Sequence, residues 1–189
     1  MPDAFLRSYQ SDVLNTIQNI DLDKVSQVIE IFKEARARGR RIFLCGNGGS
    51  FTTASHFVTE MVKSASYNRP TRFRIMMLGE SFPTLTAYSN DHSYECAFAE
   101  HLKNFAEPGD IVMALSGSGN SPSVVQVLEC AASIGCRTIA LTGRDGGKLG
   151  RIAELHINSA QQTMGKIEDS HMVIMHMICY YFMEEELRK

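Results

Sequence analysis

The sequence predicts a three-layer α/β fold in which helices cover both faces of a five-stranded parallel sheet. Short, uniformly apolar segments alternate with longer segments of helical periodicity along the 189 residues, and this alternation is typical of strands buried in a parallel sheet. Three of the turns that follow predicted strands are rich in glycine and serine. Ligands of such sheets bind at the carboxyl ends of the strands, so we expect the three turns to form a site along one edge.

Two amphipathic helices are predicted to precede the sheet. Apolar residues recur at helical spacing over residues 3–20 and 23–38, and Gly39 ends the second helix. Neither helix belongs to the alternating pattern that follows. We therefore expect residues 1–38 to take part in packing between subunits.

The five predicted strands are short and mostly apolar. They are residues 41–45, 73–78, 111–116, 138–142 and 154–158. Helices are predicted after the first strand and over residues 93–106, 121–135 and 164–187. Residues 80–91 are expected to be irregular or briefly helical. Ser50 and Ser121 are expected to cap the helices after the first and third strands.

The composition indicates a cytoplasmic globular protein with one domain, residues 1–189. An apolar fraction of 44% is sufficient for a buried core. The net charge of −2, without a basic stripe, argues against binding to nucleic acid or to a membrane surface. The first residues lack the apolar core of a signal peptide, and no apolar run is long enough to cross a bilayer. The five cysteines form no CxxC pair, which favours reduced thiols in the core.

The last predicted helix is apolar on nearly all sides. Such a helix must be buried on most of its surface. In a domain of this size we favour packing between identical subunits as the explanation. A helix that is covered by its own chain is the alternative.

Two glycine- and serine-rich turns, residues 46–50 (GNGGS) and 116–121 (SGSGNS), are predicted to bind phosphate. Glycines allow a ligand to approach the backbone closely, and free N–H groups at the start of a helix attract an anion. The second turn adds the hydroxyls of Ser116, Ser118 and Ser121. Each turn alone is also compatible with an ordinary strand-to-helix connection. Their position on one edge of the sheet favours phosphate binding.

The phosphate is expected on a sugar and not on a nucleotide. Phe51 stands where the dinucleotide fingerprint requires its third glycine. The sequence also contains no phosphate-binding loop of the type found in ATPases.

Histidines and carboxylates near these turns are candidates for metal binding or acid–base catalysis. His56 and Glu60 are four residues apart and share one helix face, although such pairs are also common on helix surfaces. His176 lies in an apolar run, where a metal, a catalytic role or an interface hydrogen bond would offset the cost of burial. Glu168 and His176 lie about 80° apart around the helix and ~12 Å apart along it, so binding one ion requires their side chains to reach towards each other. His171 is interpreted as a buried, hydrogen-bonded histidine.

Further motifs accompany the two turns. They are CGNGGS at 45–50, the AxHFxxE pattern that ends at Glu60, Asn68-Arg69-Pro70, Asn90-Asp91, SGNS at 118–121, LTGRDGGK at 141–148 and the histidine of the last helix. This combination resembles the SIS (sugar isomerase) domain family and, within it, the phosphoheptose isomerases. The likeness extends over nearly the whole chain, including the two leading helices.

The resemblance implies a flavodoxin-like SIS domain that interconverts sedoheptulose 7-phosphate and D-glycero-D-manno-heptose 7-phosphate through an enediol, in heptose biosynthesis. It also implies a homotetramer with active sites between subunits and one zinc ion per subunit. Glu60 and His176 are the implied catalytic base and acid. The implied zinc ligands are His56, Glu60, Glu168 and His176. The implied substrate-binding residues are Asn47, Gly48, Gly49, Ser50, Glu60, Asn90, Asp91, Ser116, Gly117, Ser118, Ser121 and Glu168.

Four positions depart from the family pattern. Glu168 stands in place of the family's glutamine ligand, and a carboxylate also binds zinc. Gly117 replaces the expected threonine of the phosphate loop. Ser64 replaces an arginine and Gly165 an acidic residue. The predicted fold and phosphosugar binding are compatible with these changes, which bear mainly on heptose specificity.

Two other functions within the same family stay open. One is a non-catalytic regulator that binds phosphosugars, and the presence of His56, Glu60 and His176 together argues against it. The other is a tetrameric assembly module that binds a replication initiator. The relative of that type lacks the full set of metal ligands, so the metal content of the purified protein would distinguish it.

Overall fold

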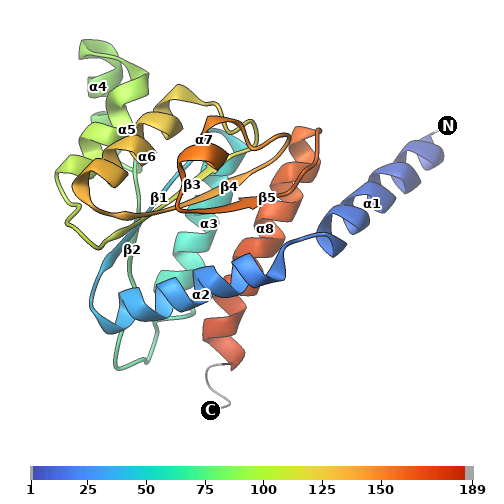
Figure 1. The fold of residues 1–189 in the computed structure, drawn as a ribbon, viewed down its shortest axis with the longest axis horizontal. Helices are drawn as coiled ribbons and strands as arrows, with labels where there is room; N and C mark the ends of the chain where they lie inside the picture. The colour runs from blue at the N-terminus through green and yellow to red at the C-terminus, as the bar shows by residue number, and fades with distance from the viewer. Residues whose placement is uncertain (1, 186–189) are drawn as a thin grey trace.

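A parallel sheet of five strands forms the centre of the molecule, in a computed structural model that describes residues 2–185 (Figure 1). The strands are β1 (Arg41–Cys45), β2 (Arg74–Met77), β3 (Ile111–Ser116), β4 (Arg137–Thr142) and β5 (Leu155–Asn158). Their order is β2-β1-β3-β4-β5, and each neighbouring pair is parallel. The predicted fold class is therefore confirmed. β2 lies on one side of β1, and β3 to β5 lie on the other, so the β1/β3 crevice is the topological switch point at which such sheets bind ligands.

Helices cover both faces of this sheet. Side chains alternate between the two faces along each strand, and because both sets are apolar, both faces must be buried. Ile42 and Leu44 of β1 join the core formed with α2 (Leu22–Ala37), α3 (Gly49–Lys63) and α8 (Met164–Tyr180). The intervening residues Phe43 and Cys45 join the opposite core. The helices on that second face are α5 (Tyr94–Lys103), α6 (Pro122–Ile134) and α7 (Gly147–Ile152).

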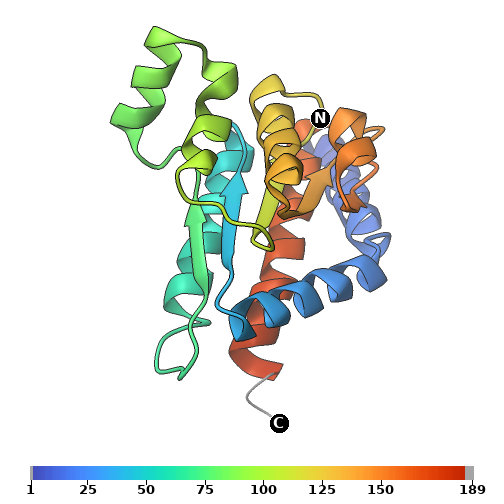
Figure 2. The same cartoon turned by 60° about the vertical axis from the view of Figure 1, so that its left-hand side comes forward.

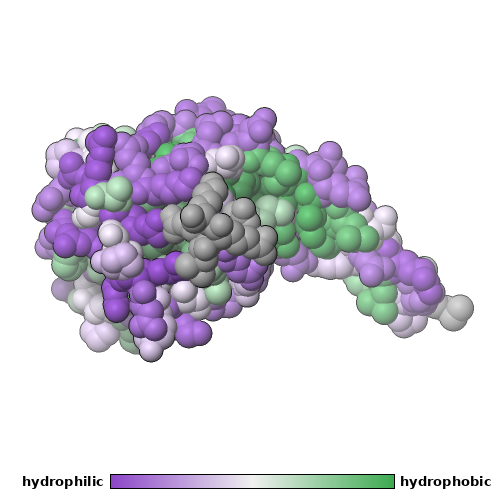
Figure 3. All heavy atoms as spheres, turned by 90° about the horizontal axis from the view of Figure 1, so that it is seen from below, coloured by the Kyte–Doolittle hydropathy of each residue, from purple (hydrophilic) through white to green (hydrophobic). Residues whose placement is uncertain are grey.

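Two helices extend away from the layered body. The first is α1 (Pro2–Gln18), which projects to one side in Figure 1 and in which Thr16 alone is buried. The second is α4 (Phe82–Asp91), which stands away from the sheet in Figure 2 and has no buried residue. Apolar surface gathers where α1 joins the body (Figure 3), and Leu14 and Leu22 are exposed at this junction.

Several predicted boundaries differ from the structure. The segment expected to be irregular or briefly helical contains the ten-residue helix α4. The six-residue helix α7 was not predicted, because its sequence is rich in glycine. The last helix becomes a π-helical turn at Tyr181–Glu185, and its predicted end at Leu187 lies outside the described residues.

Ser50 does not cap α3, contrary to the prediction. Gly48 takes the N-cap position with φ of +52°, so Ser50 lies inside the first turn of the helix, is buried and makes no capping bond. Glycine adopts this backbone conformation without the strain that a side chain would add. The predicted ends of α6 are confirmed, with Ser121 as N-cap and Gly135 in a left-handed C-cap.

The last long helix is covered to a large extent by its own chain. Ile174, Met175 and Ile178 of α8 are fully buried in the core shared with α2 and α3. Ile167 is also fully buried, next to Gly117 and Gly143. Of its remaining apolar residues, Cys179 is buried, Met172, Val173 and Met177 are half-buried, and Met164 and Tyr180 are exposed. The apolar character of α8 is therefore explained mostly within one chain, and α1 is the element with a larger uncovered apolar surface.

Across residues 2–185, the structure contains no helix with the length and hydrophobicity needed to cross a membrane. All five cysteines are free thiols, and three of them are buried. The sequence predicted cysteines in the core, and the structure places Cys45, Cys136 and Cys179 there, whereas Cys96 and Cys130 are half-buried.

Candidate active site

The turns after β1 and β3 meet at the switch point of the sheet. The ends of these strands lie side by side, with Cys45 paired to Ala114. Between the turns and the start of α8 lies a cavity of about 300 Å³, here called the serine cavity. It is lined by Asn47, Gly48, Gly49, Ser50, Leu115, Ser116, Gly117, Ser118, Ser121, Met164 and Glu168. The structure thus brings the two predicted phosphate-binding turns together.

The serine hydroxyls of the second turn converge on one point. Ser116 Oγ lies 3.4 Å from Ser118 Oγ and 3.3 Å from Ser121 Oγ. Ser121 is the N-cap of α6, and none of its side-chain atoms is used for capping. A helix N-terminus with three adjacent hydroxyls suits an anion with several oxygen atoms, such as a phosphate group.

The third glycine-rich turn supports the second one from behind. Gly143 N–H donates to the carbonyl of Gly117 at 3.2 Å, and Leu149 N–H donates to that of Gly119 at 2.9 Å. The backbone of Gly119 has φ of +65°, and an added Cβ would lie 2.1 Å from the carbonyl oxygen of Gly146. The three turns therefore share one edge of the sheet, as predicted, but the third does not line the serine cavity.

Two side chains of α8, Met164 and Glu168, line the cavity and occupy the positions that side chains on Gly117 and Gly49 would take. A Cβ on Gly117 would lie 2.4 Å from the sulfur of Met164, so Met164 fills the place of the threonine that the family pattern predicts. A Cβ on Gly49 would lie 2.2 Å from a carboxylate oxygen of Glu168. Glu168 therefore sits at the N-terminus of α3, where the helix dipole favours a negative charge. It is the one charged residue in the lining, so an anion must be held by hydroxyls, N–H groups and the start of α6.

Asn47 is fixed by two residues that the sequence did not single out. Tyr94 donates its hydroxyl to Asn47 Oδ1 at 2.6 Å, and Asn47 Nδ2 donates to Ser123 Oγ at 3.1 Å. Ser123 lies two residues after the SGSGNS turn, so its position in the sequence was a signal for a role at this site. Tyr94 and Met164 belong to distant helices, and no motif marked them.

The two predicted metal-binding histidines face each other. His56 Nε2 of α3 lies 3.0 Å from His176 Nε2 of α8, with the rings nearly perpendicular. Glu60 follows one turn later on α3 and is half-buried. Gly49 and His56 are seven residues apart on one face of α3, so the histidine pair lies about 10 Å along the helix from the serine cavity. In a single chain, the histidine pair is therefore separate from that cavity.

The histidine pair fits part of a zinc site. Two nitrogens bound to one tetrahedral zinc ion at ~2.0–2.1 Å would lie about 3.3 Å apart, which is near the observed separation. Among residues 2–185, however, no three or more His, Cys, Asp or Glu side chains are gathered so as to hold a metal. The carboxylate of Glu168 lies against Gly49 instead. The structure thus places two of the four predicted ligands together.

Other predicted site residues lie apart from the serine cavity. Asn90 and Asp91 are exposed at the end of α4, where Asn90 Nδ2 donates to Asp91 Oδ1 at 2.8 Å. His171 is buried, and its Nε2 lies 3.0 Å from the carbonyl oxygen of Thr142. The prediction of a buried, hydrogen-bonded histidine is confirmed for this nitrogen, whereas Nδ1 has no partner among the described residues.

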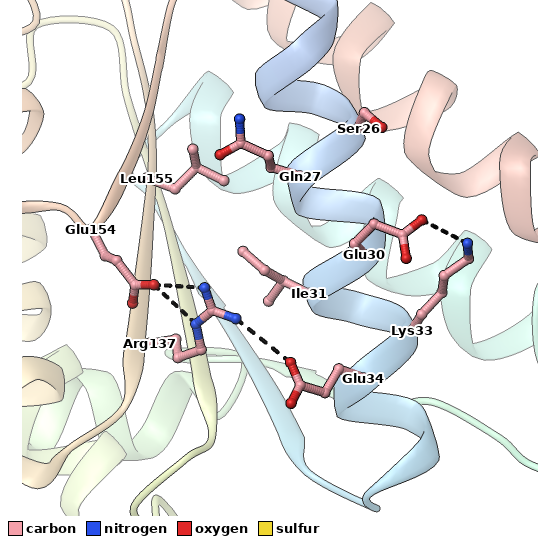
Figure 4. Close-up of a pocket in the computed structure, with 9 residues that line it drawn as sticks. All are labelled: Ser26, Gln27, Glu30, Ile31, Lys33, Glu34, Arg137, Glu154 and Leu155. Atoms are coloured by element: carbon pink, nitrogen blue, oxygen red, sulfur yellow. Dashed lines mark hydrogen bonds and ion pairs between the residues drawn. The ribbon is translucent and has the colours of Figure 1, made fainter.

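A larger cavity, of about 550 Å³, lies at the opposite edge of the sheet between α2 and the starts of β4 and β5 (Figure 4). Arg137 binds Glu154 at 2.6 Å and lies 3.8 Å from Glu34 across this cavity. Lys33 pairs with Glu30 at 2.7 Å. Both cations of this cavity, Lys33 and Arg137, already have carboxylate partners, and the carboxylates outnumber them, so the cavity does not suit an anion.

Comparison with known proteins identifies the family. A family model described as SIS domain matches residues 6–143, which is more than half of the chain. The chain belongs to the SIS domain family. The phosphoheptose isomerase of Akkermansia muciniphila is 36% identical to this SIS domain over 155 residues, which cover 82% of each chain. That of Mycobacterium tuberculosis is 39% identical over 140 residues, covering 74% of this chain and 71% of the relative.

Solved structures agree with this SIS fold. The phosphoheptose isomerase from Neisseria gonorrhoeae superposes with a TM-score of 0.88 at 24% identity, covering 96% of this chain and 98% of that one. Its identity is low, so it supports the fold alone. The relatives of higher identity are isomerases, and this SIS domain is an enzyme of the same class.

Proposed function

We propose that this SIS domain is an aldose–ketose isomerase of phosphorylated sugars, and that it interconverts sedoheptulose 7-phosphate and D-glycero-D-manno-heptose 7-phosphate. The observation that carries the proposal is the convergence of Ser116, Ser118 and Ser121 beside the Gly48–Gly49 turn. The names of the relatives support a heptose phosphate as the substrate.

The phosphate would occupy the serine hydroxyls and the N-terminus of α6. Glu168 would then accept hydrogen bonds from the sugar hydroxyls, and Asn47 would donate to them, because both residues line the same cavity. A sugar chain that extends along α3 would bring its far carbons towards His56 and Glu60, about 10 Å away. An extended seven-carbon chain suits that separation better than a shorter one.

The reaction needs a base at carbon and an acid at oxygen. Glu60 would take the proton from C1 of the ketose while His176 donates a proton to the carbonyl oxygen on C2, which gives the enediol. Glu60 would then return its proton to C2, and the hydroxyl on C1 would give its proton to His176. The product is the aldose, and both residues regain their starting protonation states.

We infer that His56 and His176 hold a zinc ion, with Glu60 as the carboxylate one turn away on α3. Glu168, the fourth predicted ligand, lies against Gly49 and would have to leave the serine cavity to join them. When bound, zinc would polarise the substrate carbonyl. The support for this inference is the convergence of the two imidazole nitrogens from neighbouring helices. We further propose a cytoplasmic homotetramer, which is supported by the exposed apolar residues of α1.

Proton exchange in D2O tests the proposed function. The protein is incubated with a panel of five- to seven-carbon sugar phosphates, and NMR follows ketose–aldose exchange and deuterium incorporation at the carbon next to the carbonyl. We expect exchange with sedoheptulose 7-phosphate, loss of exchange in Glu60→Gln, and unchanged exchange in the exposed control Glu95→Gln. Undiminished turnover in Glu60→Gln would refute the role of this residue as base. Binding without turnover in the native sequence would favour a regulator.

A further inference from the structure

Asn47 is held by two side chains, those of Tyr94 and Ser123, to which the mechanism above assigns no role. Tyr94, the first residue of α5, donates to Asn47 Oδ1 at 2.6 Å. Asn47 Nδ2 donates to Ser123 Oγ, near the start of α6, at 3.1 Å. Both ends of the carboxamide are therefore fixed, and its orientation in the turn after β1 is set.

The two contacts leave the carboxamide able to bind a ligand. The amide nitrogen keeps a second N–H group, and the oxygen keeps a second lone pair. Asn47 lines the serine cavity beside Gly48, so these free positions are next to the space for the sugar. Its backbone carbonyl also accepts the N–H of Phe51 at 3.3 Å, so the same residue starts the hydrogen bonding of α3.

Tyr94 reaches Asn47 from the other side of the turn. A second cavity, of about 410 Å³, lies there, and Asn47 and Gly48 line both cavities. The ring of Tyr94 packs edge-on against Phe98, with centroids 5.9 Å apart. Burial, with a smaller effect from the Cys45 thiol, raises the pKa of Tyr94 above its usual value, so its hydroxyl keeps its proton and remains a donor.

We propose that Tyr94 is a positioning residue, which together with Ser123 orients the Asn47 carboxamide towards the hydroxyl groups of the bound sugar. This inference rests on the proposed function. It concerns the sugar chain and not the phosphate, whose place is among the serine hydroxyls. Loss of the Tyr94 hydroxyl should therefore weaken binding of the sugar phosphate and leave binding of inorganic phosphate unchanged.

Tyr94→Phe tests the inference, because it removes the hydroxyl and keeps the ring against Phe98. An uncharged hydrogen bond of ordinary strength predicts that KM for sedoheptulose 7-phosphate rises about 3- to 10-fold, with kcat within about twofold. Ser123→Ala should act in the same direction. The matched control is Tyr67→Phe. Tyr67 is exposed just beyond the C-terminal end of α3, and it lines neither cavity.

A double-mutant cycle separates positioning from a general loss of stability. In an Asn47→Ala background, Tyr94→Phe should add less than a twofold change in KM, because the group that it orients is gone. A full additional 3- to 10-fold effect in that background would overturn the inference. So would an unchanged KM in Tyr94→Phe alone.

A readout without catalysis distinguishes failure of this inference from failure of the proposed function. In protein with 15N-labelled asparagine, the side-chain amide signals of Asn47 are those that disappear in Asn47→Ala. We expect them to shift and to exchange faster with water in Tyr94→Phe, and to stay in place in Tyr67→Phe. Absence of isomerase activity in the native sequence would refute the proposed function, while unmoved Asn47 signals would refute the role of Tyr94.

Discussion

His171 is a buried imidazole whose protonation opposes folding. Burial lowers its pKa to about 4, although the hydrogen bond with the Thr142 carbonyl acts in the opposite direction. In the unfolded chain an imidazole has a pKa of about 6.5. Between these two values the unfolded state binds a proton that the native state does not, so stability is complete above about pH 6.5 and falls as the pH decreases towards 4.

We therefore expect His171 to contribute to acid sensitivity. The shift from about 6.5 to about 4 corresponds to a loss of up to about 3 kcal/mol in the free energy of unfolding as the pH falls from 7 to 4. Urea unfolding at several pH values measures this loss. His171→Gln keeps an N–H donor and does not titrate, so its stability should depend less on pH. Equal pH dependence in both proteins would contradict the prediction.

The pair Gly117 and Met164 gives a second prediction for single residues. Gly117→Thr should cost about 1 kcal/mol of stability, because the new Cβ meets the sulfur of Met164 at 2.4 Å and this side chain must move. In a Met164→Ala background the same substitution should cost almost nothing. Thermal unfolding of the four proteins of this cycle measures the coupling. Additive effects would show that Met164 does not fill the place of the missing side chain.

At the scale of elements, the sequence was most informative where burial is uniform. The strands were found because both faces of the sheet are covered, which leaves apolar runs such as residues 111–116. Helix α7 was missed because it is stabilised by contacts distant in sequence, such as the Leu149 N–H bond to the Gly119 carbonyl. The predicted capping role of Ser50 was wrong because Gly48, with its positive φ, is the N-cap of α3, two residues before the predicted position.

The pairing of α3 with α8 predicts a metal effect that involves both helices. If His56 and His176 bind one zinc ion, zinc at 100 times its dissociation constant should stabilise the fold by about 2.7 kcal/mol, because the unfolded chain has no such site. His56→Ala and His176→Ala should each abolish this stabilisation, and the exposed control His92→Ala should keep it. Thermal unfolding with and without zinc, together with metal analysis, provides the measurement. Equal stabilisation of all three variants would exclude this site.

For the whole molecule, the sequence predicted which turns meet, but not which side chains from other helices hold these turns in position. The two phosphate-binding turns could be inferred because parallel strands end at one edge. The roles of Tyr94 and Met164 could not be inferred, because they depend on how α5 and α8 dock against those turns. Nor does a single chain bring Glu60 or Asp91 into the serine cavity. In the proposed homotetramer, a second subunit would be the source of a more complete site.

Helix α1 is the element on which this assembly should depend. Phe5 and Leu14 are 68% and 54% exposed in the single chain, and each large apolar side chain buried between subunits would contribute about 1.5–3 kcal/mol. The double variant Phe5→Glu/Leu14→Glu should therefore dissociate while its circular dichroism stays unchanged. Light scattering after size exclusion measures the mass, and Gln10→Glu serves as a control for added charge on an exposed position. Isomerase activity per chain should fall with the mass, because Asn90 and Asp91, two of the predicted substrate-binding residues, do not line the serine cavity of their own chain. A native chain that is monomeric and fully active would show that one subunit is sufficient.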